Sequence, residues 1–562
     1  MKNISAVLAL TLVIIVFLAF LPSLQNGFVN WDDGEYVYHN SFIKSASLKN
    51  IQKIICAYFV SNYHPLTMLS YFFDYRIFRL NPFGYHLTSL MLHLANCLLV
   101  FWLINLLSRN VFIAFITALF FGIHPLHVES VAWISARKDV LSAFFFLAAL
   151  ISYLGYLRQL PAKKYYYLSL SLFIAACLSK SMAVTLPAVL LLIDYVTARP
   201  SDKKMFREKI PFIFASLVFG AIGFLSQYTT GAYRHEYSYT FFDKLIRVGY
   251  CLIFYLRNTF IPGKLACLYP YPEKMAIAWS LFIAVLVAIF IFALYKKTHS
   301  RKVVFGSAFF LITLLPVLQV LPFSETAVAD RHTYIPLIGI FYLVGEGVAW
   351  LYRKKLVSLL SRLAIIAILI AIFAGLTMLT RERTKAWKDS LALWNDALSK
   401  YPGLGLAYTN RGSAYFRNQE FDKAEADFKK AIEIDNTYYR RSKYAYYNLG
   451  NLYYARGFYD KATAVFQKAS QLAPGDPAPY YYLGNIYNAL GNKEEAVRLC
   501  EKSIALIKIP APEACYSLGV LYLDIGRTEE AIAMFNQAIH IDHNFVPAYA
   551  QLAGLYEKRG MK

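Results

Sequence analysis

Charged residues are scarce in this chain. They make up 16% of its 562 residues, while hydrophobic residues reach 58%. A typical soluble domain is about a quarter charged. The composition therefore excludes a wholly soluble chain and a disordered one, and the length is too great for a single domain.

Common motifs of catalysis and energy coupling are also absent. The chain has no P-loop, no GxGxxG after a strand, no GxSxG and no HExxH, so nucleotide hydrolysis and the common hydrolase chemistries have no support. No pair of inverted repeats with interrupted helices stands out, which argues against a transporter. The seven cysteines include no CxxC pair. This excludes a disulfide framework and a zinc site, and indicates small core residues.

Long apolar runs, by contrast, fill the first two-thirds of the chain. A membrane-spanning helix needs about 20 mostly apolar residues, and eleven runs approach or reach this length. These runs are residues 5–24, 84–107, 111–124, 139–157, 165–179, 182–197, 211–227, 276–295, 303–322, 334–351 and 361–380. The first run is longer than a signal-peptide core and has no A-x-A site, so we interpret it as an uncleaved anchor.

The topology depends on residues 241–262, where Lys244, Arg247 and Arg257 interrupt an apolar stretch. Charges at mid-bilayer depth are costly, so we expect a helix in the membrane interface and not a crossing. The basic segments 158–164, 199–209, 296–302 and 353–355 then share one side, as the positive-inside rule requires of cytoplasmic loops. We predict eleven spans in the plasma (inner) membrane, with the N-terminus in the cytoplasm and the C-terminus outside. The basic loops explain much of the net charge of +22, so no nucleic acid partner is expected.

After residue 380 the sequence becomes a repeat. Gly412, Gly450, Gly484, Gly519 and Ala553 follow one another at intervals of 34 to 38 residues, and each precedes a Tyr by three positions. Small and large residues recur downstream at the same period. This pattern resembles the tetratricopeptide repeat, in which small residues let two antiparallel helices approach each other.

The repeat register extends backwards to Trp394, Ala397 and Pro402, which lie 34 residues before Phe428, Ala431 and Asn436. A half repeat therefore joins the last span to the array with almost no linker. We predict two domains, a membrane domain at 1–380 with a large first outer loop at 25–83, and a tetratricopeptide array at 381–562 on the outer side. Such arrays bind peptides or partner proteins and do not by themselves imply catalysis.

The outer face carries polar residues that the topology does not require. Asp32 and Asp33 follow the first span, where adjacent carboxylates are costly unless they bind a cation, take a proton from a hydroxyl, or cap a helix in GEYVYHN. The sequence leaves these uses open.

Two further outer loops add candidates. HPLHVESVAWISARKDVL contributes His124, His127, Glu129, Arg137 and Asp139 to a charged cavity lining, and its HxxH allows a metal pair, although Pro125 breaks the helical spacing. FSETAVADRHTYIP contributes Arg331, which suits a phosphate; the alternative is a salt bridge to Asp330 or Glu325. His86 and His93 share a helix face and suit either a polar pocket or helix packing.

An ordered set of motifs identifies a family. The motifs are WDD, YHPLT, LNPFGYHLTSLMLH, HPLHVESVAWISARKDVLSA, LSKSMAVTLP, DRHTYIPLIG and the C-terminal array. Together they resemble the transmembrane and tetratricopeptide-repeat proteins related to protein O-mannosyltransferases, over nearly the whole chain. The resemblance implies a membrane glycosyltransferase of the C-type fold. It would transfer a sugar, mannose, from a polyprenyl-phosphate donor to Ser/Thr hydroxyls on the outer side.

The resemblance also assigns residues. It places the catalytic Asp at Asp32, with Asp33 beside it, the R-x-D pattern at Arg137 and Asp139, and a donor-phosphate contact at Arg331. The chain departs from many relatives at His64, where they carry Arg, and at Gly34-Glu35, where Arg is frequent; these departures bear on the donor sugar and the acceptor. His64, His124, His127 and Glu129 complete the expected cavity.

The cofactor and the function retain alternatives. The sequence does not decide whether a divalent metal replaces some of the cationic side chains. The expected partners are a polyprenyl-phosphate sugar, acceptor proteins or peptides held by the array, and the lipid bilayer. The alternatives to sugar transfer are an inert membrane-anchored scaffold that assembles envelope proteins, and a lipid flippase.

Overall fold

The computed structural model describes residues 2–158, 163–229, 240–270, 300–318, 328–353, 358–434, 439–507 and 510–558, and the single residues 285, 288, 292 and 296. Within these ranges the chain is helical, without a named strand, and an isolated bridge joins Phe59 and Asn62. The prediction of an all-α protein is confirmed. Contacts divide the chain into two compact units, Met1–Tyr401 and Pro402–Lys562.

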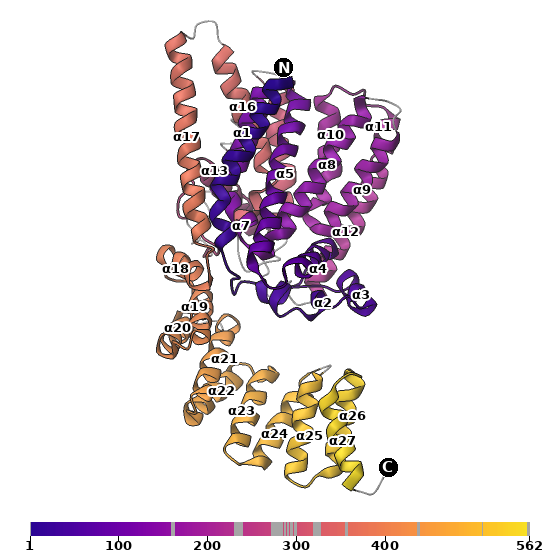
Figure 1. Ribbon diagram of the computed structural model, residues 1–562, viewed down its shortest axis with the longest axis vertical. Coiled ribbons are helices and arrows are strands. Elements are labelled where there is room, and N and C mark those ends of the chain that lie inside the picture. Colours follow the sequence, from indigo (N-terminus) through magenta and orange to yellow (C-terminus); the bar gives the residue numbers. More distant parts are fainter. Residues whose placement is uncertain are drawn as a thin grey trace. The chain divides into compact units, whose positions relative to one another are not determined.

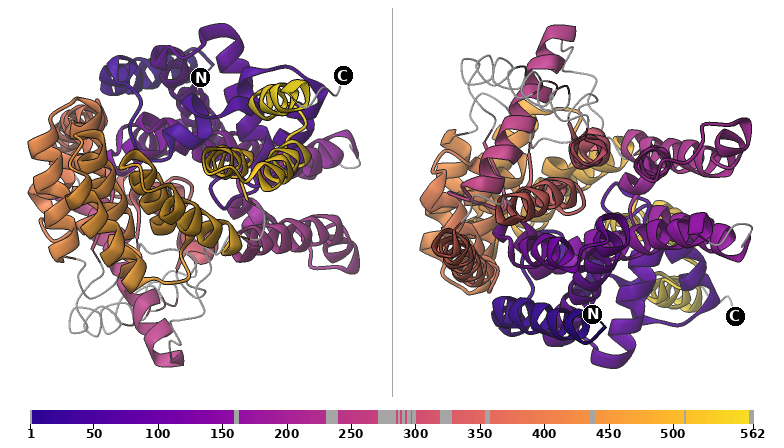
Figure 2. Two further views of the ribbon diagram at one scale, coloured as in Figure 1. Left: turned by 90° about the horizontal axis from the view of Figure 1, so that it is seen from below. Right: turned by 90° about the horizontal axis from the view of Figure 1, so that it is seen from above.

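The first unit is a bundle of apolar helices (Figure 1), seen from its two ends in Figure 2. Its longer helices are α1 (Lys2–Phe20), α5 (Pro82–Ser108), α6 (Val111–Ile123), α8 (Arg137–Arg158), α9 (Lys163–Ser179), α10 (Leu186–Val196), α12 (Ile210–Thr229), α13 (Phe241–Phe260), α15 (Arg301–Leu314), α16 (Leu337–Arg353), α17 (Leu359–Lys385) and α18 (Ser390–Lys400). Between them lie the shorter α7 (Val128–Ala132), α11 (Lys203–Arg207) and the turns η1 (Leu21–Gln25), η3 (Pro125–His127), η4 (Ile134–Ala136), η5 (Ser181–Thr185), η6 (Leu315–Val317) and η7 (Asp330–Thr333).

Several of these helices can cross a membrane. Five are long and apolar enough: 3–25, 82–108, 134–158, 203–229 and 359–385. Taken together, the segments Val111–Ile123 and Pro125–Ala132 are also long and apolar enough, but a bend of 53° separates them. The chain is thus a membrane protein. The predicted runs at 165–179, 182–197, 303–322 and 334–351 are shorter helices, and the run at 276–295 lies outside the described ranges, so the count of eleven stays a prediction.

Small residues set how closely α15 and α16 approach. A Cβ added at Gly339 would lie 2.3 Å from the Gly306 carbonyl oxygen, and one added at Gly306 would lie 2.4 Å from Leu343. Glycine therefore allows backbone contact between these helices, as in other membrane bundles. Helix α16 leads directly out of η7, so this contact fixes the position of the segment that carries Arg331.

The predicted first outer loop folds into three helices, α2 (Ser41–Lys44), α3 (Leu48–Cys56) and α4 (Pro65–Phe78), after the short π-type helix η2 (Gly34–Tyr38). Figure 1 shows α2, α3 and α4 at one end of the bundle. Their buried side chains form a cluster with Tyr36 and Ile134. The Thr67 hydroxyl donates to the Ser179 carbonyl at 3.0 Å, which joins α4 to the end of α9.

Helix α18 lies in the first unit, although the sequence predicts it as a half repeat of the array. Contacts divide the chain after Tyr401, and the Lys400 ammonium donates to the Leu265 carbonyl of the first unit at 2.6 Å. The half repeat is thus packed against the membrane helices.

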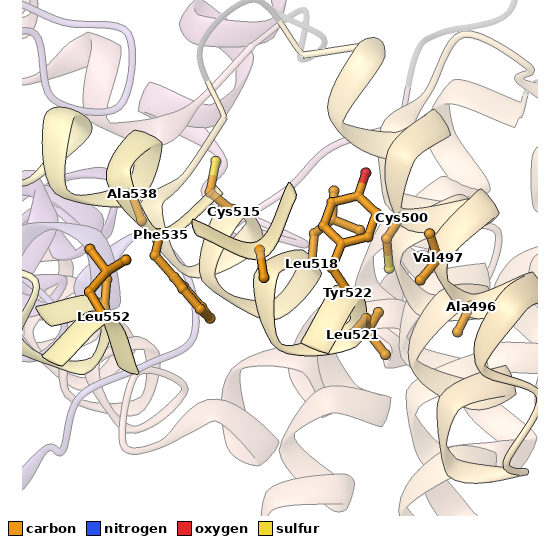
Figure 3. Packing of buried hydrophobic residues seen from close by; sticks show 12 residues of the cluster. Ala496, Val497, Cys500, Cys515, Leu518, Leu521, Tyr522, Phe535, Ala538 and Leu552 are labelled. Atoms are coloured by element: carbon orange, nitrogen blue, oxygen red, sulfur yellow. The ribbon is translucent and has the colours of Figure 1, made fainter. Parts of the chain in front are cut away.

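The second unit is a solenoid of antiparallel helix pairs. Its helices are α19 (Gly405–Arg417), α20 (Phe421–Ile434), α21 (Tyr439–Ala455), α22 (Tyr459–Leu472), α23 (Pro477–Ala489), α24 (Lys493–Ala505), α25 (Pro512–Asp524), α26 (Thr528–Ile541) and α27 (Val546–Lys558). The predicted small-to-large contacts are present, since a Cβ at Gly450 would lie 2.4 Å from Phe466 and one at Gly519 2.7 Å from Phe535. Figure 3 shows Phe535 among the buried residues of α24–α27.

Candidate active site

Asp33 holds the loop after α1 against the segment before α8. Its Oδ2 accepts a hydrogen bond from the Val29 amide at 2.9 Å, and its Oδ1 accepts from the Ser135 amide at 3.1 Å and the Ser135 hydroxyl at 2.5 Å. Burial raises the pKa of Asp33 to about 7, although the hydrogen bonds from these three donors act to lower it. The side chain makes no capping bond to η2, so the helix-cap interpretation is wrong for this residue.

Asp32 differs from Asp33 in its backbone conformation and in its hydrogen bonding. Its backbone is left-handed, with φ of 64°, a conformation that Asp tolerates better than most residues but that still carries strain. None of the described residues donates a hydrogen bond to its carboxylate. Burial raises its pKa, while the charges of Lys138 and Arg331 lower it. Asp32 thus presents an uncommitted carboxylate that can accept a proton.

Arg331 lies beside this carboxylate, on η7. Its guanidinium donates to Glu129 Oε1 at 2.5 Å, its backbone amide donates to Glu129 Oε2 at 2.9 Å, and it stacks over Trp133 at 5.4 Å. The predicted alternative, a salt bridge to Asp330, is wrong, because Asp330 accepts instead from the Tyr269 hydroxyl at 2.6 Å. Glu325 lies outside the described ranges.

A small pocket of about 20 Å³ adjoins Arg331. Asp139, Lys180, Arg331 and His332 contribute its charged and titratable side chains, from α8, the α9–η5 junction and η7. The Lys180 ammonium pairs with Asp139. Two cations in one pocket suit a phosphate group, which each can hold by charge-assisted hydrogen bonds.

His64 and Lys138 lie near this pocket. His64 is buried against the Tyr36 ring at 5.3 Å, and neither of its ring nitrogens has a hydrogen-bond partner in the described part of the chain. Burial, with the charges of Lys138 and Lys180, lowers its pKa well below the usual value. A neutral imidazole with an unused N–H can donate to a hydroxyl or phosphate oxygen.

The Arg137 side chain lies outside the pocket that adjoins Arg331. It is fully buried, pairs with Asp74, and donates to the Tyr85 carbonyl at 2.6 Å and to the Ser89 hydroxyl at 3.2 Å. It does not line the pocket, so the structure corrects its expected place in the cavity. Its donors hold α4 and α5 together.

His124 and His127 bind backbone carbonyls. His124 Nε2 lies 2.9 Å from the Thr259 oxygen, and His127 Nδ1 lies 2.7 Å from the Phe121 oxygen. Neither lines the pocket. The described residues contain no group of three or more His, Cys, Asp or Glu that could hold a metal ion.

Sequence reasoning missed a tryptophan stack made of Trp31, Trp133, Trp387 and Trp394. Trp133 stacks on Trp31 at 6.3 Å and on Trp387 at 5.6 Å, and Trp31 meets Trp394 edge-on at 5.2 Å. Trp394 had been predicted only as the large residue of a half repeat, and no local pattern indicates its partner.

Hydrogen bonds accompany this stack. The Trp394 indole donates to Asn30 Oδ1 at 2.7 Å, the Trp133 indole donates to the Trp31 carbonyl at 2.7 Å, and the Asn30 amide donates to the Ser390 hydroxyl at 3.0 Å. The segment that precedes Asp32 is therefore held by α18. The conformation of the candidate base depends on residues near position 390.

Family models match the second unit. The tetratricopeptide repeat matches residues 405–438 and 512–545, and related repeat models match 450–491 and 480–509. Among solved structures, the chain is similar to the crystal structure of MamA, with 26% identity and a TM-score of 0.24 over 27% of this chain and 85% of that one. The predicted tetratricopeptide array is confirmed.

Curated relatives match the first unit as well. A Caenorhabditis elegans protein O-mannosyl-transferase is 25% identical over 457 residues, which are 76% of this chain and 63% of that protein. The mouse protein O-mannosyl-transferase TMTC3 is 23% identical over 66% of this chain and 44% of its own length, and mouse TMTC1 is 36% identical over 25% and 16%. The chain thus spans less than two-thirds of each of these relatives. The likeness predicted from the sequence motifs is confirmed: this chain is similar to the transmembrane and tetratricopeptide-repeat protein O-mannosyltransferases.

Proposed function

We propose that the chain is a glycosyltransferase of the C-type fold that moves mannose from a polyprenyl-phosphate donor to Ser/Thr hydroxyls of proteins. The observation that carries this proposal is the uncommitted Asp32 carboxylate near a pocket with two cations. The names of the relatives support the reaction class.

The reaction needs a base and a phosphate site. The acceptor hydroxyl attacks the anomeric carbon of the sugar, and its proton passes to Asp32. The bond from the anomeric carbon to the phosphate oxygen breaks, and the electron pair leaves with the polyprenyl phosphate. Arg331 and Lys180 stabilise the charge that develops there. A single displacement inverts the anomeric carbon.

His64 would orient the sugar. It is buried near Lys138 and Lys180, and its unused N–H is the kind of donor that a sugar hydroxyl accepts. Asp33 would act as a positioning residue, since both of its carboxylate oxygens already accept hydrogen bonds within the protein.

The described residues do not favour a divalent metal at this site. Asp139 is paired with Lys180, Glu129 is paired with Arg331, and no group of three ligands is present among the residues described. In this mechanism, side chains alone therefore supply the base and the positive charge.

The proposed site faces the outside of the plasma (inner) membrane, with the array extracytoplasmic. The grouping of basic loops on the opposite side supports this orientation. The array would hold acceptor proteins or peptides, as tetratricopeptide arrays commonly do.

One observation favours the alternative of an inert scaffold. Both pocket cations already have carboxylate partners, Glu129 for Arg331 and Asp139 for Lys180. In an enzyme, the donor phosphate would have to compete with these partners or share the cations with them.

Transfer of labelled mannose from its polyprenyl phosphate to a Ser/Thr peptide, by purified full-length protein in nanodiscs, tests both functions. We expect transfer by the native chain and by Asp422→Asn, whose carboxylate in the array is 92% exposed, but not by Asp32→Asn. Full activity in Asp32→Asn would exclude it as the base. No transfer by the native chain, with stable capture of envelope proteins, would favour the scaffold.

A further inference from the structure

The first outer loop carries positive charge that the proposed topology does not explain. Between residues 41 and 81 there are five basic residues, Lys44, Lys49, Lys53, Arg76 and Arg79, and a single acidic one, Asp74. Asp74 is buried and paired with Arg137, so it does not neutralise the surface. Outer loops are normally poor in Lys and Arg, so these five residues call for another reason.

Helix α3 is amphipathic, with one apolar edge inside the protein and another outside. Ile54 is buried in the cluster that contains Tyr36. Leu48 and Ile55 continue the same apolar side of the helix but are 86% and 44% exposed. Lys49 and Lys53 occupy the polar side, and both are exposed. The outer apolar edge of α3 therefore has no covering in the described part of the chain.

Helix α4 repeats this arrangement. Met68 and Tyr71 are buried, whereas Phe73 is 61% exposed and Ile77 is 71% exposed. Arg76 lies between the two exposed apolar residues along the chain and is itself exposed. An exposed apolar edge flanked by cations recurs on neighbouring helices, which distinguishes it from a scattered surface side chain.

The cations of this face have no acidic partners among the described residues. No salt bridge to any of the five basic residues is formed by the described residues. Two of the charged groups lie over aromatic rings instead: Lys53 Nζ lies 4.8 Å from the centre of the Phe42 ring, and Arg76 Cζ lies 4.9 Å from that of Phe72. A cation over an exposed ring gains only about 0.5–1 kcal/mol and keeps its positive charge, so an anionic partner can still bind it.

The position of these helices identifies the partner. The loop begins after the candidate span at 3–25 and ends at the candidate span at 82–108, and Figure 1 shows α2–α4 at one end of the bundle. We propose that the outer edges of α3 and α4, with Leu48, Ile55, Phe73 and Ile77 and their flanking Lys and Arg residues, dock on anionic phospholipid headgroups of the outer leaflet. Basic amphipathic helices bind such surfaces by burying apolar side chains and pairing with lipid charge.

This docking would support the site without contacting substrate. The buried residues of α3 and α4 pack in one cluster with Tyr36, and Lys138 lies over the Tyr36 ring at 4.8 Å. Lipid binding would therefore fix the loop that carries Asp32. The inference does not require sugar transfer, so its failure and that of the proposed function are separate outcomes.

Cys56 at the end of α3 provides a probe, because it is exposed and the other six cysteines are buried. Full-length protein labelled there with a polarity-sensitive fluorophore is placed in nanodiscs of phosphatidylcholine alone or mixed with phosphatidylglycerol. We expect a blue-shifted emission and quenching by headgroup-labelled lipid in the mixed discs, and a loss of both in Lys49→Gln/Lys53→Gln. Leu48→Ser should weaken the quenching independently of charge.

The matched control is Lys461→Gln/Lys468→Gln, which removes two exposed charges from the array and should leave the emission unchanged. Equal emission in both kinds of disc would overturn the proposal. A shift that disappears when the discs are diluted, independently of lipid, would also overturn it and indicate a second copy of the chain as the occupant.

Discussion

Mutations of the adjacent carboxylates Asp32 and Asp33 should have different effects on stability and on sugar transfer. Asp33→Asn keeps one carbonyl oxygen, so at least one of the three donors now at 2.5–3.1 Å loses its acceptor and faces an amide N–H. An unsatisfied buried donor costs about 1–3 kcal/mol. Asp33→Ala removes both acceptor oxygens, leaves all three donors without an acceptor and should cost up to about three times as much.

Asp32→Asn should behave in the opposite way. No described residue donates to the Asp32 carboxylate, and burial disfavours its charge, so the midpoint of thermal unfolding should stay the same or rise. Loss of a general base lowers the rate constant for transfer by about 10²–10⁴-fold. Thermal unfolding in detergent, followed by tryptophan fluorescence, and single-turnover transfer in nanodiscs measure the two effects on the same protein.

The pH dependence adds an independent check. Burial raises the pKa of Asp33 to about 7 from 3.8, so within this range the folded chain binds more protons than the unfolded chain. The contribution of Asp33 to the free energy of unfolding therefore falls as the pH rises between these values. Asp33→Asn should remove this slope, and Asp32→Asn should leave it. Lower stability in Asp32→Asn, combined with full stability and no transfer in Asp33→Asn, would refute the assignment.

Three further predictions concern the surroundings of the site and the array. Lys138→Met removes a charge that lowers the pKa of Asp32, so the acidic limb of the profile of kcat against pH should move to higher pH; an unchanged limb would exclude Asp32 as the titrating group. Trp394→Phe keeps an aromatic ring but removes the indole N–H that lies 2.7 Å from Asn30 Oδ1, and the loss of this hydrogen bond costs about 1 kcal/mol. The substitution should lower kcat more than it raises the KM for a short peptide. Gly450→Val places a side chain where a Cβ already lies 2.4 Å from Phe466, at a cost of about 1–3 kcal/mol. Hydrogen exchange should then increase in α21 and α22 but not in the first unit, whereas Gly475→Ala, which meets nothing within 4 Å, should have no effect.

Local periodicity made the array predictable. The spacing of Gly412, Gly450, Gly484 and Gly519 indicates helix pairs because each glycine and its large partner lie only 16 residues apart, as in Gly450 with Phe466. Apolar runs likewise predict membrane helices, since length and composition are properties of one segment.

The site was predictable only in part. The sequence indicated Asp32 and Asp33 but could not separate them, because their difference lies in donors from Ser135, 102 residues away. Arg137 was misplaced since its partner Asp74 comes from another helix. Lys180 lies in the motif LSKSMAVTLP, which assigns it no role, and only the folded structure pairs it with Asp139.

The hydrogen bonds that join the first loop to the end of α17 and to α18 have a consequence for the order of synthesis. Asn26 bonds to Thr384 and Asn30 to Trp394, partners that are translated 358 and 364 residues later. At about 5–20 residues per second, this delay is on the order of 20–70 s. During that interval Asp32 has left the ribosome but its loop lacks these anchors, although the helices from α1 to α17 are being inserted. A nascent chain should thus gain its candidate base only when the last membrane helix and α18 are complete, so that under the proposed function incompletely synthesised chains should not transfer sugar.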